Sequence, residues 1–322
     1  MRKAWFARRQ VATPRQNPNC RSEFAYPFGA MFVLAHLSDV HLAVRPRLLE
    51  LPSKRGLGFI NWQRGRKNVH RVEVLDAIAH DLKACAPDHV AVTGDLVNLS
   101  LPAEYMRARV WLESLGPPFD VTVTLGNHDV YVPGAVRLPA EFWGEYMRGD
   151  DGAEPGTFPF LRRREKVALI VLSSAVPTAP FLATGRLGER QLSSLATLLD
   201  ETSGLFRVVL IHHPPVGRAR GHLRRLTDAR QFRQVLAAKG AELVLHGHDH
   251  RRSLIWLEGL HRKIPTLGVP SASAQAPHRR EHAGGFNIFR IDGEPGAWRC
   301  DVTTRMRDAD GRVRALESET LW

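Results

Sequence analysis

The sequence predicts an α/β protein in which mixed β-sheets are flanked by helices. Two observations predict this class. Short apolar runs alternate with helical patterns between residues 32 and 246, and only strand-like segments follow Arg251. Strands that alternate with helices and then follow one another without helices are typical of a mixed sheet system with helices packed against it.

The first half of the chain switches regularly between strand and helix patterns. Three short β-type runs predict strands, at 32–38 (FVLAHLS), 89–95 (HVAVTGD) and 121–129 (VTVTLGNHD). Apolar residues at helical spacing predict a helix over 72–82, and a second helix is expected over 102–115. An irregular, loop-rich stretch then extends to about residue 157.

The second half begins with an expected hairpin over 158–174 and continues with the same alternation. A helix at 188–200, a strand at 207–213, a helix at about 227–239 and a strand at 241–247 are expected, with Thr227 as the cap of the second helix and Gly240 as its terminator. Four strand-like segments complete the chain: 253–259, 263–269, 285–292 and 297–304.

These elements suggest one main domain with additions. Residues 1–30 are basic and aperiodic and predict a disordered extension; Met31, directly before the first strand, is a plausible true start, so the extension is either a flexible tail or not translated. The domain is expected over 31–295, with an insertion at 45–71, and a C-terminal strand and tail over 296–322.

Composition excludes several classes of protein. The three cysteines are odd in number and lack CxxC spacing, which favours a reducing cytoplasm over a disulfide framework or a zinc knuckle. No apolar run reaches the roughly 18 residues of a membrane helix. The net charge of +12 resides in 1–30 and 45–71, so the rest of the chain is formally neutral. A non-specific nucleic-acid binder would more often spread its charge over a whole face, so nucleic acid is disfavoured as a partner.

Potential metal ligands follow five of the expected strands. Asp39 and His41 follow the first strand and Asp95 the second. The other three strands are followed by Asn127 and His128, by His212 and His213, and by the run HGHDH, which contains His246, His248 and His250. The carboxyl ends of strands in open sheets meet at one rim, where ligands bind. Carboxylates, an amide and imidazoles without thiolate suit manganese, iron or zinc, and they are too many for one ion. The set therefore predicts a dinuclear hydrolytic site.

The ordered motifs resemble those of the calcineurin-like metallophosphoesterases. The family signature of DxH, GD, GNH(D/E), a lone His and GHxH is matched by Asp39-Val-His41, Gly94-Asp95, Gly126-Asn127-His128-Asp129, His212 and Gly247-His248-Asp249-His250. The resemblance covers roughly residues 31–295 and is greatest for the bacterial cyclic-nucleotide phosphodiesterase branch. It implies a four-layer αββα sandwich.

The resemblance also implies roles for the individual residues. Two divalent or trivalent ions (Mn, Fe or Zn) would be held, the first by Asp39, His41 and His250, the second by Asn127, His212 and His248, with Asp95 as the bridge. His128, oriented by Asp129, would act on the substrate phosphate, and a metal-bridging hydroxide would attack phosphorus in line. A phosphodiesterase acting on a small phosphoester is expected. His213 and His246 are expected to be packed around the site, and His70 to be a surface or structural residue.

Other interpretations stay open at this stage. Each motif alone could be turn or cap chemistry. A lipid-linked pyrophosphatase resembling the UDP-diacylglucosamine hydrolases would suit the 45–71 insertion, although that family has Arg where this chain has His128. A nuclease or a scaffold without activity are further alternatives. The insertion mixes Lys and Arg with Leu, Phe, Ile and Trp, so it is either a solvated loop or a cap that grips an anionic substrate or contacts an anionic membrane peripherally at the inner face.

Overall fold

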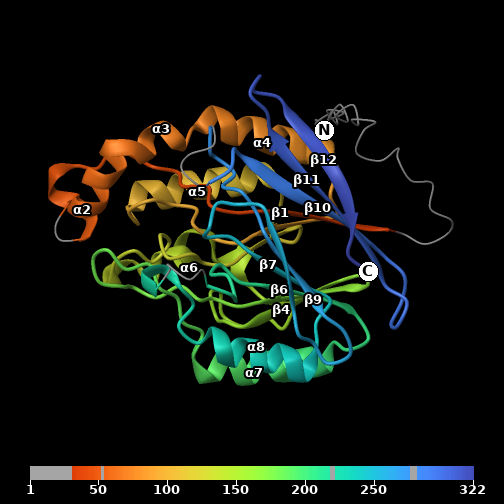
Figure 1. The fold of residues 1–322 in the computed structure, drawn as a ribbon. Helices are drawn as coiled ribbons and strands as arrows, with labels where there is room; N and C mark the ends of the chain where they lie inside the picture. Colours follow the sequence, from red (N-terminus) through yellow and green to blue (C-terminus); the bar gives the residue numbers. More distant parts are fainter. Residues whose placement is uncertain (1–30, 52–53, 218–221, 276–280) are drawn as a thin grey trace, which may run out of the picture.

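Two six-stranded sheets lie face to face in the computed structural model, with helices on both outer sides (Figure 1). The structure describes residues 31–51, 54–217, 222–275 and 281–322, so the expected basic extension lies outside the described residues. The predicted α/β class and the four-layer αββα sandwich are confirmed. Within the described residues no helix is both long and apolar enough to cross a membrane.

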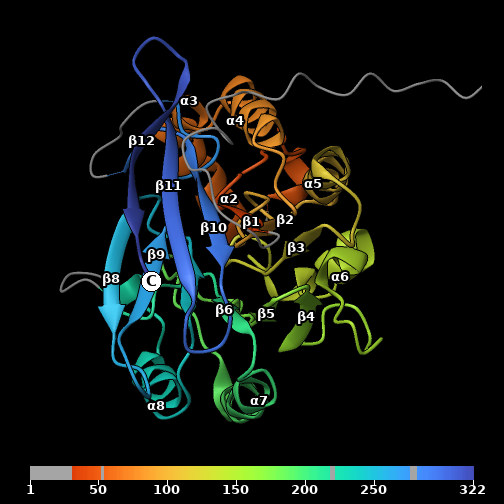
Figure 2. The ribbon, with the colours of Figure 1, turned by 90° about the vertical axis from the view of Figure 1, so that its right-hand side faces the viewer.

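The first sheet combines three parallel strands on one side with an antiparallel meander on the other. Its order is β12-β11-β10-β1-β2-β3, in which β1 pairs in parallel with β2 and β2 with β3. The strands are β1 (Phe32–Leu37), β2 (His89–Val92), β3 (Val121–Val123), β10 (Gly285–Asp292), β11 (Arg299–Arg307) and β12 (Val313–Thr320). Helices α4 (Val72–Ala84) and α5 (Pro102–Leu115) cover its outer face (Figures 1 and 2).

The second sheet has the order β4-β5-β6-β7-β9-β8, with parallel pairing from β5 through β9. Its strands are β4 (Phe160–Arg164), β5 (Val167–Val171), β6 (Phe206–Leu210), β7 (Leu243–His246), β8 (Ser253–Leu257) and β9 (Ile264–Gly268). The β4–β5 hairpin is as predicted. Helices α7 (Gly188–Glu201) and α8 (Ala229–Lys239) cover the outer face, at the bottom of Figure 1.

Strand β5 shows why the apolar runs of the second sheet are continuous rather than alternating. Val167, Leu169 and Val171 point into the large core between the sheets, whereas Ala168 and Ile170 join a second core beneath α7 and α8. A strand covered on both faces must be apolar at every position.

Local details differ from the sequence-based expectations. The N-cap residue of α8 is Asp228 rather than Thr227. The Thr227 hydroxyl donates a hydrogen bond to Gly185 O instead. The stretch expected to be loop contains the short helices η3 (Pro133–Ala135), α6 (Leu138–Trp143) and η4 (Gly144–Met147). Residues 296–322, expected to hold one strand and a tail, contain β11 and β12; β12 is an edge strand with mostly exposed side chains, so it lacks a hydrophobic alternation.

The 45–71 insertion forms a helical arm. It consists of η1 (Leu48–Glu50), α2 (Lys54–Asn61), the π-helical turn η2 (Trp62–Arg66) and α3 (Lys67–Val69), which lead into α4. The arm projects from the helical layer of the first sheet, at the left of Figure 1.

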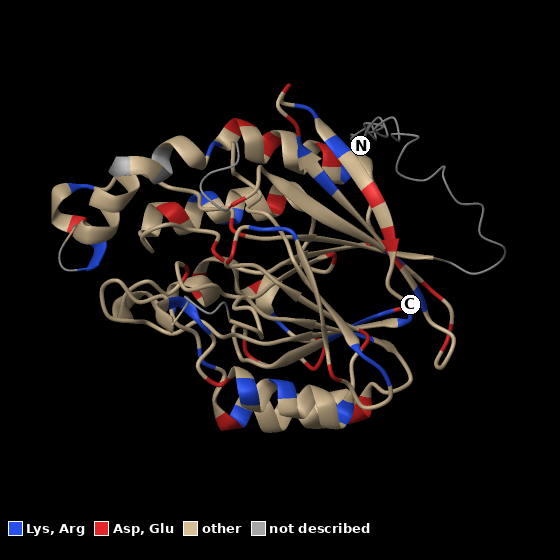
Figure 3. Ribbon diagram, viewed as in Figure 1, with Lys and Arg blue, Asp and Glu red and all other residues tan. Residues whose placement is uncertain are grey.

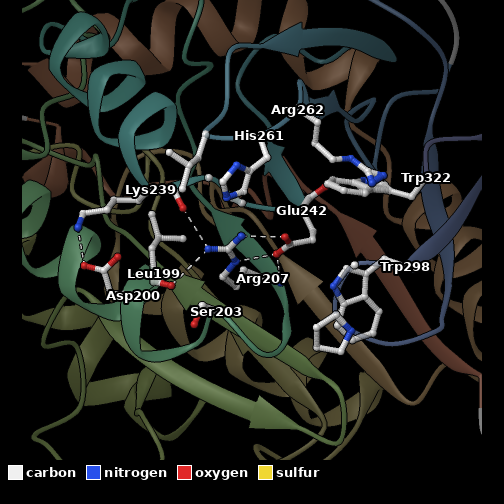
Figure 4. A pocket seen from close by; sticks show the side chains of 15 residues that line it. Leu199, Asp200, Ser203, Arg207, Lys239, Glu242, His261, Arg262, Trp298 and Trp322 are labelled. Carbon is white, nitrogen blue, oxygen red and sulfur yellow. Dashed lines mark hydrogen bonds and ion pairs between the residues drawn. The ribbon is translucent and has the colours of Figure 1, made fainter.

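Where β6 begins, a buried ion pair joins the helices α7 and α8 to the second sheet. Arg207 at the start of β6 bonds both carboxylate oxygens of Glu242, at 2.7 and 2.8 Å, and also donates to Leu199 O in α7 and Lys239 O in α8. Trp322 Nε1 donates to Glu242 O. These side chains line a pocket of about 430 Å³ (Figure 4). Because Arg207 engages the carboxyl-terminal carbonyls of both helices, it caps them.

We expect Arg207→Met to destabilise the protein by about 3 to 5 kcal/mol, because it leaves Glu242 buried without its partner. The midpoint of urea unfolding measures the loss. The control is Lys239→Met, which removes the more exposed pair with Asp200 and should cost at most about 1 kcal/mol. Equal losses of stability from the two substitutions would contradict the conclusion that the Arg207–Glu242 ion pair stabilises the contact between these helices and the sheet.

Candidate metal centre

The candidate ligands meet where the parallel strands of both sheets end. Asp39 follows β1, Asp95 follows β2, and Asn127, His212 and His248 follow β3, β6 and β7. All seven candidate ligands are buried, none of them more than 5 % exposed. Desolvating so many polar groups is costly unless they satisfy one another or a cation.

The loops that carry these residues turn sharply. Five of the candidate ligands have left-handed backbone conformations, with φ between 50° and 69°: Asp39, His41, Asp95, His248 and His250. Such φ values are uncommon for residues with a Cβ and often mark functional sites. Gly247 permits the close approach of two of these loops, because a Cβ there would collide with Ser38 Oγ and lie 2.6 Å from Asp39 Oδ2.

The first group of side chains consists of Asp39, His41 and His250. Asp39 Oδ1 lies 3.1 Å from His250 Nε2 and 3.8 Å from His41 Nε2. The two imidazole Nε2 atoms are themselves 3.1 Å apart. Because two nitrogen lone pairs repel at this distance, the arrangement requires either a proton or a cation between the rings.

The second group consists of Asp95, His212 and His248. Asp95 Oδ2 is 3.4 Å from His212 Nε2, and His212 Nε2 is 3.2 Å from His248 Nδ1. Backbone carbonyls hold the far side of each ring: His212 Nδ1 donates to Thr93 O, and His248 Nε2 donates to Arg224 O. These bonds aim His212 Nε2 and His248 Nδ1 at the centre of the group, as in histidine metal sites.

Two further observations fit a pair of cations. Asp95 Oδ2 also lies 4.0 Å from His41 Nε2, so this carboxylate stands between the two groups. The Asn127 side-chain oxygen is buried and has no hydrogen-bond partner within the described part of the chain. An oxygen and nitrogen donor set with one shared carboxylate suits two first-row metal ions.

The structure differs from the expectation for Asp129. Its carboxylate does not reach the His128 ring but accepts four backbone N–H groups, from Asp95, Leu96, Val97 and Gly126. His128 is oriented instead by Asn98, whose backbone oxygen lies 2.6 Å from His128 Nδ1, and its own N–H donates to Asp95 Oδ1. Asp129 therefore organises the loops that carry the site.

Sequence reasoning missed His70, expected to be a surface or structural residue. Its ring centre lies 4.5 Å from that of His41, and it shares a group of potential metal-ligating atoms with His41 and His250. Glu281 was also missed; its Oε2 lies 3.2 Å from His250 Nδ1. Neither residue belongs to a motif, and both reach the site through loops distant in the sequence, so the pattern of the chain contains no sign of them.

His213 and His246 lie beside the site and are buried. His213 Nδ1 bonds Ser174 Oγ, and its ring packs 4.3 Å from that of His248. His246 Nδ1 contacts Gly247 O, and a Cβ at Gly268 would come within 2.7 Å of its ring. This close packing limits the replacements that His246 could accept.

Two of the imidazoles have raised pKa values in the metal-free protein. Burial opposes protonation, but the Asp95 carboxylate outweighs it and raises the pKa of His212 to about 9. In the same way, Asp39 and then Glu281 outweigh burial and raise the pKa of His250 to about 9. These protons occupy the positions that a cation would take.

Binding of Mn²⁺ or Zn²⁺ should therefore release about two protons per molecule at pH 7.5, and apparent affinity should rise with pH up to about 9. Calorimetry in buffers with different ionisation enthalpies counts the protons. His80→Gln, an exposed change on α4, is the control and should leave the count unchanged. Metal binding with no proton release would contradict the charged state of His212 and His250.

Comparison with known proteins agrees with this geometry. Residues 32–252 match the calcineurin-like phosphoesterase family. A probable cyclic nucleotide phosphodiesterase of Synechococcus sp. is 29 % identical over 278 residues, which cover 84 % of this chain and 91 % of that protein. The glycerophosphodiester phosphodiesterase GpdQ of Enterobacter lignolyticus is 26 % identical over 255 residues, or 77 % of this chain and 80 % of that protein.

Among solved structures, the purple acid phosphatase PPD1 of yellow lupin (Lupinus luteus) shares the fold. Its TM-score is 0.54 at 16 % identity, over 92 % of this chain and 54 % of that chain. The family match covers more than half of the chain and includes all five motifs. The chain thus belongs to the calcineurin-like phosphoesterase family and is a metal-dependent phosphoester hydrolase.

Proposed function

We propose that the chain hydrolyses phosphodiesters at a two-metal centre. Asp39, His41 and His250 would hold one ion, Asn127, His212 and His248 the other, and Asp95 would bridge them. The observation that carries the proposal is the position of Asp95 Oδ2, 3.4 Å from His212 Nε2 and 4.0 Å from His41 Nε2. When bound, the ions would activate water and clamp the oxygens of an in-line displacement at phosphorus. Manganese, iron and zinc all suit this donor set.

His128 is the residue we assign to the substrate. A ligating atom of its ring lies within 4.8 Å of such atoms of His41 and Asp95. The bond to Asn98 O holds the hydrogen on Nδ1, which leaves Nε2 as the atom that would hold a second proton and give it to the departing alkoxide. Because the backbone bond to Asp95 ties His128 to the bridging residue, the acid and the metal ligands keep one geometry.

The preference for diesters is supported by the relatives. Proteins 24 to 29 % identical to this chain are named as probable cyclic nucleotide phosphodiesterases, and another as a glycerophosphodiester phosphodiesterase. A cyclic nucleotide is thus the first substrate to test. The alternative is a nucleotide-linked lipid pyrophosphate, which would meet the site at a membrane surface beside the helical arm.

We expect Asp95→Asn to lower kcat/KM for bis(4-nitrophenyl) phosphate more than a hundredfold in the Mn²⁺-loaded enzyme. Loss of a residue that only orients a metal ligand costs about 10- to 100-fold, and loss of the proposed bridging ligand itself should cost more. His128→Asn should cost about 10²- to 10⁴-fold while metal binding is retained. Release of 4-nitrophenolate and calorimetric metal titration measure the two effects, with His80→Gln as control. Turnover that survives Asp95→Asn would sink the proposal.

The helical arm supports a second part of the proposal, peripheral contact with an anionic membrane at the inner face of the cytoplasmic membrane. Leu48 and Leu49 are 88 % and 93 % exposed, and Leu57 and Ile60 of α2 are also exposed. Arg45 and Arg47, just before these leucines in the chain, are exposed as well, and Figure 3 colours basic residues along the arm. Adjacent apolar and basic side chains suit the interface of acidic lipids better than the phosphate backbone of a nucleic acid.

Vesicles containing phosphatidylglycerol should sediment the protein, whereas pure phosphatidylcholine vesicles should not. Replacing Leu48 and Leu49 together by Ser should weaken sedimentation by about thirtyfold or more, because each leucine that enters the lipid contributes more than 1 kcal/mol. The exposed pair Met106 and Val110 of α5, replaced by Ser, is the matched control. Unchanged sedimentation after the Leu48 and Leu49 replacements would exclude the arm as the contact; retention by single-stranded DNA instead would favour the nuclease alternative.

A further inference from the structure

Lys54, the first residue of α2, is a buried lysine whose ammonium lies over the ring of Tyr131. The side chain is 7 % exposed. Its Nζ donates to Thr178 Oγ1 at 2.9 Å and lies 4.2 Å from the centre of the Tyr131 ring. The Thr178 hydroxyl in turn donates to Leu182 O, so the threonine acts toward Lys54 as an acceptor only.

Among the described residues, this ammonium has no counter-charge. In the described part of the chain, no carboxylate forms an ion pair with Lys54, and its contacts are a neutral hydroxyl and an aromatic face. Burial lowers the pKa of Lys54 to about 8. An ammonium offers three N–H donors, and a buried charge without a carboxylate partner is costly. The surroundings of Lys54 would therefore be stabilised by an anion.

Tyr131 connects Lys54 with the candidate active site. Its ring stacks on that of His128, with centres 5.3 Å apart and planes 7° from parallel. Its backbone N–H donates to Ser100 Oγ, and the Ser100 hydroxyl donates to His128 O. Tyr131 thus contacts both the Lys54 ammonium and the His128 imidazole.

The arm is fixed beside Tyr131. Arg55 donates to Leu99 O at 3.1 Å and to Ser100 O at 2.6 Å. Both lie in the loop after β2, which also bonds His128 through Asn98 O and the Ser100 hydroxyl. Gly58 lies so close that a Cβ there would be 2.7 Å from the Tyr131 hydroxyl. Lys54 is therefore held at the site by its neighbours rather than extended into solvent.

We propose that Lys54 and Tyr131 form a subsite for a second anionic group of the substrate, a carboxylate or phosphate carried by the alcohol that is not the leaving group. This inference rests on the proposed phosphodiesterase function and predicts that diesters with an additional negative charge are hydrolysed with higher kcat/KM than diesters without one, among them simple cyclic nucleotides. The ammonium would pair with that anion, and the phenol would border the organic part of the ester.

Two synthetic diesters with the same leaving group test the subsite. Phenyl 4-nitrophenyl phosphate and 4-carboxyphenyl 4-nitrophenyl phosphate both release 4-nitrophenolate, and only the second carries an extra anion. The readout is the ratio of their kcat/KM values, which cancels any general change in activity. The wild-type enzyme should prefer the carboxylated ester about tenfold or more, since a desolvated charge pair contributes at least that factor.

Lys54→Met should bring the ratio close to one, and Lys54→Arg should preserve the preference. Lys83→Met, an exposed lysine of α4, is the matched control and should keep the wild-type ratio. Raising the salt concentration should lower the ratio for the wild type without any change of sequence.

The outcomes separate the two proposals. If the metal-loaded wild type hydrolyses neither ester nor any other diester, the proposed function fails. If it hydrolyses both esters at similar kcat/KM, or if Lys54→Met keeps the preference, the subsite is wrong while the function stands, and Lys54 only anchors the arm. If Lys54→Met lowers the melting temperature strongly, its kcat/KM ratio no longer tests the subsite. The subsite then stands if salt lowers the wild-type ratio and Lys54→Arg keeps the preference, and it fails if either result is absent.

Discussion

Burial of several carboxylates and imidazoles at one point is the constraint on which the rest of this structure depends. Asp39 and Asp95 are almost fully buried, and each lies within ion-pair distance of two histidines. A carboxylate removed from water needs charge and hydrogen bonds in return. Protonated imidazoles supply that charge here, and bound metal ions would supply it in their place.

The loops around the site are built by two other buried carboxylates. Asp129 gathers four backbone N–H groups from the loops after β2 and β3, and Glu104 accepts N–H groups from Val44, Asn98, Leu99 and Leu101. Such bonds compensate for the irregular backbone of the ligand loops, in which several residues adopt positive φ. Rigid support of this kind would keep the candidate ligands in place when metal ions replace the protons.

The two ends of the sandwich have different tasks. At the carboxyl ends of the parallel strands, polar side chains converge, and the arm lies against Tyr131 and the loop after β2. At the opposite end, Arg207 and Glu242 fasten the ends of α7 and α8 to β6 (Figure 4). The positive-φ residues and the buried carboxylates lie at the candidate metal centre, where chemistry is expected. The Arg207–Glu242 ion pair, which we expect to stabilise the fold, lies at the opposite end.

The sequence by itself determined the layered α/β class, the family and the rim on which the candidate ligands lie, because strand periodicity, tight glycine turns and motif order are local properties of the chain. It missed β12, whose exposed edge has no apolar alternation, and it placed the cap of α8 at Thr227 instead of Asp228. Only the tertiary structure brought His70 to His41, assigned Asp129 to backbone amides and set Lys54 over Tyr131. These contacts join segments far apart in the chain, and no local pattern records which distant loop will close on which.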